Sequence, residues 1–233
     1  MNKKIISTVL SLLVMTSSIS VFAYSDCNDE SVNSLTELNV LSGYGDDTFK
    51  PANLLSRAEF AKMISTATGF SETEEQGEIQ EEIQSVFSDV DNTYWALEYI
   101  NHCKALMLVN GYEDATFRPD NNISFAEVIK VCLSAVGYNQ LITEEGDNWY
   151  DSWLDLAYEY KLIDTRDIDA NKKISRVEMA QLLYRTINLP LYQLNGYRVV
   201  DGVLTPTFDF ADGTVDKNGD EKPLKTLLTM YLQ

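Results

Sequence analysis

The sequence has little of the chemistry on which many enzymes and metalloproteins depend. Its single histidine, His102, excludes a multi-histidine metal site and disfavours a Ser/His/Asp or Cys/His catalytic centre. Three cysteines are too few for a disulfide framework. Cys103 and Cys132 fall at apolar helix positions, which favours buried thiols and leaves a single Cys103–Cys132 bridge as the alternative. No cofactor is predicted.

Basic residues are also scarce, because 18 Lys and Arg stand against 36 Asp and Glu and give a net charge of −18. Without Lys3 and Lys4 the remaining chain has 16 basic and 36 acidic residues, a net charge of −20. Nucleic acid and anionic lipid repel such a chain at long range. We therefore predict neither as a partner, and any anionic ligand must be held by a few locally placed Arg or Lys side chains.

Long hydrophobic runs are absent as well. The apolar stretch from Ile5 to Val14 is too short to cross a bilayer, and no second run follows it. Lys3 and Lys4 precede it, and Ala23 ends a Val-Phe-Ala sequence suited to cleavage. These features predict a secretory signal peptide over residues 1–23 and a secreted protein, with an N-terminal membrane anchor as the alternative.

What the sequence does contain is one short motif three times. Each copy reads S-x-x-E, with an apolar residue before the Ser and another after the Glu. This is a capping box with a hydrophobic staple, which starts a helix. The structural capping residues are therefore Ser56 and Glu59, Ser124 and Glu127, and Ser175 and Glu178.

A loop motif repeats at a fixed offset of 68 residues. Residues 43–51 and 111–119 share Gly, Tyr, Asp, Thr, Phe, a basic residue and Pro at equivalent positions. Such self-similarity predicts a repeat architecture. Apolar spacing adds helices over 31–41, about 94–109 and 149–163 before the loops. The third loop, 164–173, lacks the Gly-Tyr-x-Asp pattern.

The predicted fold class is therefore all-α, with three helix–loop–helix repeats and a short tail. The predicted segments are 1–23 (signal peptide), 24–70 (repeat 1), 71–85 (acidic linker), 86–138 (repeat 2), 139–190 (repeat 3) and 191–233 (tail). The tail is either a linker or an irregular or β-hairpin appendage, with strands at 197–200 and 203–204 around Asp201-Gly202.

Over about residues 24–190 the chain resembles the S-layer homology family. The motifs that carry the resemblance are Phe87-Ser88-Asp89-Val90 with Trp95, the two Gly-Tyr-x-Asp loops and the three capping boxes. The resemblance implies a pseudo-threefold α-helical module without enzymatic activity. It also implies non-covalent anchoring of surface proteins to the wall of mostly Gram-positive bacteria, in the S-layer. The implied ligand is a secondary cell-wall polysaccharide, often pyruvylated, and other surface proteins are possible partners.

Within that resemblance, Arg57 and Arg176 are the predicted carboxylate-binding residues. Each is expected to be exposed at the first position of a helix, beside the positive end of its dipole. Phe125 replaces this arginine in repeat 2, so the pockets of Arg57 and Arg176 are favoured over the third. Surface arginines without a ligand, and tryptophans that only anchor the core, are the alternatives. Further predicted ligand-binding residues are Gly43, Tyr44, Asp46, Trp95, Gly111, Tyr112 and Asp114.

Two other functions compete with wall binding. Asp167, Asp169, Asn171 and Glu178 have the spacing of a calcium loop, which predicts a dockerin-like protein adaptor. Lys172 stands where the sharp turn of such a loop needs Gly. The abundant carboxylates also allow a carbohydrate-active hydrolase with a carboxylate pair, although no pair stands out.

Overall fold

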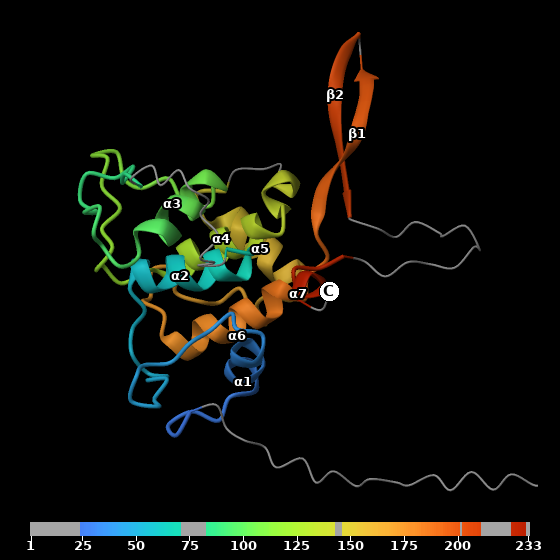
Figure 1. Cartoon of the computed structure of the whole chain (residues 1–233). Coiled ribbons are helices and arrows are strands. Elements are labelled where there is room, and N and C mark those ends of the chain that lie inside the picture. The colour runs from blue at the N-terminus through green and yellow to red at the C-terminus, as the bar shows by residue number, and fades with distance from the viewer. Residues whose placement is uncertain (1–23, 71–82, 143–145, 201, 211–224, 232–233) are drawn as a thin grey trace, which may run out of the picture.

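The computed structural model describes residues 24–70, 83–142, 146–200, 202–210 and 225–231, and these ranges form a helical body with a projecting hairpin (Figure 1). The predicted signal peptide, most of the predicted acidic linker and part of the tail lie outside the described residues. The helices are α1 (Glu30–Glu37), α2 (Arg57–Ala67), α3 (Leu97–Ala105), α4 (Phe125–Ala135), α5 (Asp151–Glu159), α6 (Arg176–Ile187) and α7 (Leu228–Tyr231), with the 3-10 helix η1 (Tyr138–Leu141). The all-α prediction with a hairpin tail is confirmed.

All three capping boxes are formed. The side chains of Ser56, Ser124 and Ser175 each accept the amide of the Glu three residues on, and each Glu carboxylate accepts the amide of its Ser. The return bonds measure 3.0, 2.9 and 2.8 Å. Reciprocal capping satisfies two otherwise unpaired donors at each helix start. This explains why α2, α4 and α6 all begin at the residue after the Ser.

The first helix of each repeat is shorter than predicted. α1, α3 and α5 end near Asn39, Met107 and Lys161, whose φ angles are +58°, +57° and +61°. The next amide in each case bonds back to a carbonyl five residues earlier, for example Val40 N to Leu35 O at 2.9 Å. This is the Schellman geometry that ends helices, and glycine usually signals it. Because these residues are not glycine, the sequence pattern did not mark the ends.

The repeats interlock rather than stand side by side. α3 packs on α2 and α5 packs on α4, so the first helix of one repeat lies on the capped helix of the preceding repeat. α1 packs on α6, which closes the ring between the first and third repeats. Gln181 on α6 also donates to Asp29 at the start of α1, at 2.8 Å. Each repeat therefore depends on its neighbours for its hydrophobic contacts.

A closed ring of backbone hydrogen bonds lies where the three repeats meet. Leu55 N donates to Ile174 O at 2.9 Å, Ile123 N to Leu55 O at 3.1 Å, and Ile174 N to Ile123 O at 3.4 Å. These three residues directly precede the capping serines and are buried. The cyclic pattern is that of a pseudo-threefold axis. It brings the starts of α2, α4 and α6 together at one point of the fold.

The cysteines are buried and free, so the Cys103–Cys132 alternative is not adopted. Burial raises the pKa of both thiols to about 12. His102 bonds Ser65 Oγ through Nδ1 at 2.9 Å, and burial lowers its pKa. The thiols of Cys103 and Cys132 and the His102–Ser65 hydrogen bond are therefore part of the internal packing of the helical body.

The tail forms the antiparallel strands β1 (Tyr192–Val200) and β2 (Val203–Phe210). Gly202 between them has φ +80°, as a two-residue hairpin turn requires. At the base of the hairpin, Tyr192 N donates to Val136 O at 2.9 Å. The rings of Tyr138 and Phe210 also pack there, with centroids 5.9 Å apart. Across the described ranges, no helix combines the length and the apolar character needed to cross a membrane.

Candidate functional site

The ring of repeats creates three equivalent interfaces. At each one, the first residue of a capped helix donates its amide to the loop of the next repeat, as Arg57 does to Asn121 O at 2.9 Å. A cavity opens beside each interface. Groove 1, at Arg57, has a volume of about 230 Å³; groove 2, at Arg176, about 150 Å³; and groove 3, at Phe125, about 260 Å³.

The two arginines are not exposed as predicted. Arg57 is 7% exposed and Arg176 is 5% exposed. Arg57 Nε donates to Phe117 O at 2.8 Å, and its Nη1 lies 2.7 Å from Glu127 Oε1. Arg176 repeats this with Phe49 O at 2.8 Å and Glu59 Oε1 at 3.2 Å. The capping glutamate of the next repeat is a half-buried anion, and the arginine lies against it because that charge needs a partner.

The two loop residues whose carbonyl groups accept from the arginines, Phe117 and Phe49, are themselves held by aspartates. Asp89 accepts the amides of Phe117 and Arg118, both at 2.7 Å. Asp26 accepts those of Phe49 and Lys50 at 2.7 and 2.9 Å. Asp26 is thus the counterpart of Asp89, at an offset of 63 rather than 68. The change of offset hid this copy of the motif from the sequence comparison.

Tyr112 and Tyr44 line grooves 1 and 2, and two cationic side chains lie over each of their rings. Arg57 lies 5.0 Å from the Tyr112 centroid, and Arg118 lies 3.9 Å from the same ring. Tyr44 has Arg176 at 4.7 Å and Lys50 at 4.1 Å. Cation–π stacking thus occupies the rings. A sugar that stacks on Tyr112 or Tyr44 would thus have to share the ring with these cations, and sugar stacking on the two tyrosines stays a prediction.

Gly43 and Gly111 also line the grooves, and their missing side chains serve internal packing. A Cβ at Gly43 would overlap the Tyr24 ring and Thr48 O, and one at Gly111 would overlap the Phe87 ring. Gly111 also has φ +74°, which favours glycine. Each glycine thus lets an aromatic ring of its own repeat, Tyr24 or Phe87, pack closely against the loop backbone.

Asp46 and Asp114 turn into their own loops. Asp114 accepts from Thr116 Oγ1 at 2.5 Å and pairs with Arg118 at 3.0 Å. The hydrogen bond from Thr116 is the main cause that lowers the pKa of Asp114 to about 2. Asp46 holds Thr48 in the same way. Neither aspartate lines groove 1 or groove 2.

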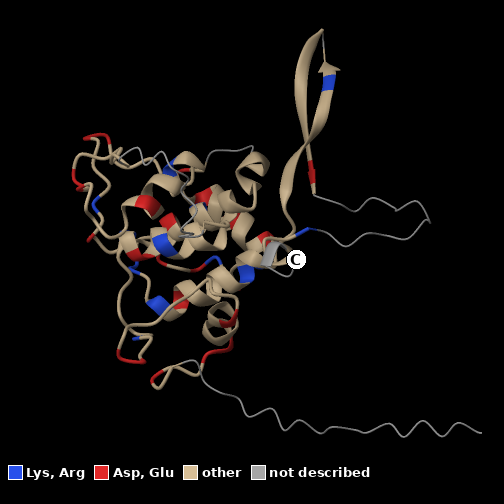
Figure 2. Cartoon of the chain, in the orientation of Figure 1, with Lys and Arg blue, Asp and Glu red and all other residues tan. Residues whose placement is uncertain are grey.

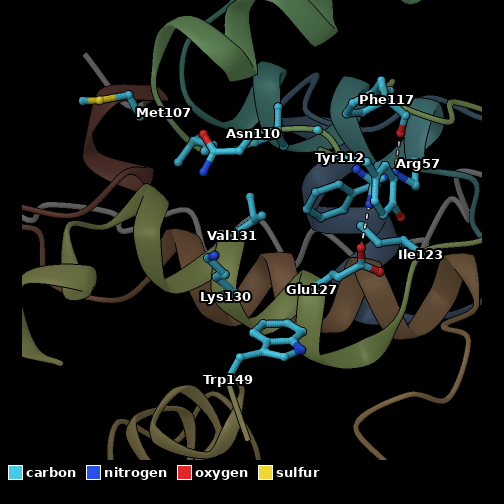
Figure 3. A pocket seen from close by; sticks show the side chains of 14 residues that line it. Arg57, Met107, Asn110, Tyr112, Phe117, Ile123, Glu127, Lys130, Val131 and Trp149 are labelled. Atoms are coloured by element: carbon cyan, nitrogen blue, oxygen red, sulfur yellow. Dashed lines mark hydrogen bonds and ion pairs between the residues drawn. The ribbon is translucent and has the colours of Figure 1, made fainter. Parts of the chain in front are cut away.

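A lysine and a tryptophan line each of grooves 1 and 2. Groove 1 contains Lys130 of α4 and Trp149, with Nζ 5.7 Å from the indole centroid (Figure 3). Groove 2 is lined by Lys62 of α2 and Trp95, and the Lys62 ammonium lies 5.1 Å from the centroid of the Tyr99 ring. The two tryptophans are 55% and 54% exposed. No ion pair joins either lysine to a residue that the structure describes. The lysines were missed in the sequence, although they too are 68 residues apart.

Groove 3 is built differently. Gln181 takes the lysine position, and the lining residues of groove 3 include no tryptophan. Lys172 reaches over the Phe125 ring at 5.1 Å and pairs with Glu178 at 2.8 Å. A loop lysine therefore supplies the cation that the Phe125 position lacks. The groove also holds an ion pair between Arg185 and Asp164, at 3.0 Å.

The same contacts bear on the calcium prediction. Glu178 is engaged by the amide and hydroxyl of Ser175 and by the Lys172 ammonium. Asp169 accepts the amide of Asn171. Among the described residues, no three acidic, His or Cys side chains converge as a cation site. Two of the four predicted calcium ligands, Asp169 and Glu178, are thus already engaged by the protein's own donors, and a calcium site here stays a prediction.

Comparison with known proteins follows the same division of the chain. The S-layer homology domain model matches residues 25–61 and 86–129. A surface layer protein of Brevibacillus choshinensis is 30% identical over 146 residues, which are 58% of this chain and 13% of the relative. A cell surface protein of Thermoanaerobacter kivui is 26% identical over 199 residues, 81% of this chain and 25% of the relative. A cellulosome-anchoring protein of Acetivibrio thermocellus is 35% identical over 97 residues, 41% of this chain and 20% of the relative. The chain thus spans at most a quarter of the length of these three relatives.

Proposed function

Because this chain belongs to the S-layer homology family, we propose that it anchors a protein to the bacterial cell wall by binding an anionic, pyruvylated secondary wall polysaccharide in grooves 1 and 2. The names of the relatives, which include surface layer and cellulosome-anchoring proteins, support the anchoring role. One observation carries the choice of ligand. A lysine without a described ion-pair partner and an exposed tryptophan line each of two grooves in a chain with net charge −18.

These two groups suit an acidic sugar. The carboxylate of a pyruvate ketal would pair with Lys130 in groove 1 or Lys62 in groove 2. Charge-assisted hydrogen bonds of this kind contribute about 1.5–3 kcal/mol. The sugar ring would lie on the open face of Trp149 or Trp95. Two moderate sites on one body would add avidity along a repeating polymer.

In this proposal the buried arginines support the grooves from inside the protein. Arg57 and Arg176 are the first residues of α2 and α6 and so lie at helix N-termini, where an anion is favoured. They also hold Tyr112 and Tyr44 against the groove walls. Gly111 and Gly43 shape the loops, while Asp114 and Asp46 brace them.

We propose binding rather than catalysis because the groove carboxylates are already engaged. Burial alone would raise the pKa of Glu59, but hydrogen bonds from Ser56 and Tyr44 and the charge of Arg176 lower it. Glu127 is likewise held by its cap and by Arg57. Release of reducing sugar from wall polymer by the pure protein would contradict this part of the proposal.

Co-sedimentation with purified walls tests the anchoring proposal. The protein should pellet with intact walls and remain in the supernatant once the secondary polymer is stripped. A Lys62→Ala/Lys130→Ala variant should lose most binding, while Lys173→Ala, an exposed lysine outside the grooves, should bind like the parent. Equal binding of the parent to stripped peptidoglycan would overturn the proposal.

A further inference from the structure

The β1–β2 hairpin has one face made entirely of apolar side chains. The pairing register aligns Leu194 with Phe208, Tyr197 with Pro206 and Val199 with Leu204, around an irregularity at 194–196. Because side chains alternate across a strand, eight residues share this face. They are Tyr192, Leu194, Tyr197, Val199, Leu204, Pro206, Phe208 and Phe210. We call this set the apolar arm face.

The helical body covers only the base of the apolar arm face. Phe210 packs against Tyr138 and Tyr160, with ring centroids 5.9 and 6.1 Å apart. Further out, Leu194, Tyr197, Val199 and Leu204 are 44%, 61%, 69% and 66% exposed. The hairpin leaves the body here and projects from it (Figure 1). A two-stranded hairpin alone is marginally stable in water, so this half of the arm lacks the packing that strands normally need.

The opposite face of the hairpin has a different character. It carries Gln193, Arg198, Thr205, Thr207 and Asp209, with Val200 and Val203 at the tip. The described strand residues thus include one basic and one acidic residue, Arg198 and Asp209, both away from the apolar arm face, whereas acidic residues are spread over the body (Figure 2). Two copies of this acidic protein repel each other body to body. The apolar arm face carries no charged residue and projects away from the acidic body, so a contact through this face reduces that repulsion.

We propose that the apolar arm face binds the same face of a second copy of this chain. Two such faces can pack about a twofold axis as layers of a small β-sandwich, about 10 Å apart. In an antiparallel arrangement, the Val199–Leu204 pair of one arm lies near the Leu194–Phe208 pair of the other. Edge pairing through β2 is disfavoured, because Pro206 has no amide hydrogen to donate.

The size of the surface sets the expected strength. The exposed fractions correspond to on the order of 500 Å² per arm, in the range of functional apolar patches. A stable interface buries about 800 Å² per partner. The contact is therefore weak and concentration-dependent, and crowding of copies on one surface would favour it.

Analytical ultracentrifugation of the full chain tests this inference independently of wall binding. Under reducing conditions, the average mass should rise from that of one chain toward twice that value as concentration increases. Concentrations from about 1 μM to 1 mM cover the Kd range of weak complexes. Added salt should strengthen the association, because it screens repulsion between the acidic bodies. A mass that stays monomeric throughout, or association that weakens with salt, would overturn the proposal.

Two neighbouring cross-strand pairs provide matched variants. Val199→Thr/Leu204→Thr changes the apolar arm face and should shift the association at least tenfold to higher concentration. Val200→Thr/Val203→Thr changes the opposite face at the adjacent position of the same hairpin and should associate like the parent. If both variants lose association equally, the effect comes from the hairpin as a whole, and the assignment to the apolar arm face is wrong.

Discussion

Replacement of Arg57 by Met should destabilise the fold far more than loss of a surface arginine. Met keeps the apolar stem but removes the hydrogen bond to Phe117 O and the ion pair to Glu127. Breaking a buried ion pair typically costs about 3–5 kcal/mol, because the remaining charge has no partner. The Glu127 side chain is 29% exposed, so water can reach it. We therefore expect the lower end, about 3 kcal/mol.

Arg118→Met is the matched control. Arg118 also lies over the Tyr112 ring and pairs with Asp114, but its side chain is 44% exposed. Exposed pairs contribute about 0–1 kcal/mol. Urea denaturation followed by far-UV circular dichroism gives both values. If Arg57→Met costs no more than Arg118→Met, the arginine is not the link between repeats that the structure indicates.

Three further predictions concern the scaffold. Gly111→Ala should lower the melting temperature strongly, because the added methyl group would overlap the Phe87 ring and because the backbone at residue 111 has a positive φ. Gly45→Ala should be nearly neutral, since the space around Gly45 is open. The lowered pKa of Glu59 means that its stabilisation is complete above about pH 4.5 and is lost as pH falls through the folded-state value; Glu59→Gln should flatten that part of a melting-temperature profile. Cys103 and Cys132, with pKa values of about 12, should react with a thiol reagent only after unfolding, and rapid labelling of the native protein would contradict their burial.

The elements that sequence predicted well are those fixed by local chemistry. The capping boxes need only residues three apart, so Ser56 and Glu59 reveal a helix start without knowledge of the rest of the fold. The hairpin was similarly indicated by a turn between two apolar runs. Local reasoning was less accurate at the helix ends, because Asn39, Met107 and Lys161 adopt a conformation that sequence usually marks with glycine.

The grooves could be predicted only in part, because they join distant segments. Groove 2 combines Arg176 of repeat 3, Tyr44 and Lys62 of repeat 1 and Trp95 of repeat 2. The sequence marked Arg176, Tyr44 and Trp95 through family motifs. It could not show that the arginine turns inward to Glu59, which lies 117 residues away along the chain. Nor could it show that Lys62 is the cation left at the surface.

Carboxyl-reduced polysaccharide offers the most direct test of ligand recognition. The affinities of the parent and of Lys62→Ala/Lys130→Ala for solubilised wall polymer would be measured by calorimetry, before and after chemical reduction of the polymer carboxylates. We expect reduction to weaken binding of the parent by tenfold or more, and to change little for the variant. If the parent binds both polymers equally, or if the variant still distinguishes them as the parent does, these lysines do not recognise a carboxylate.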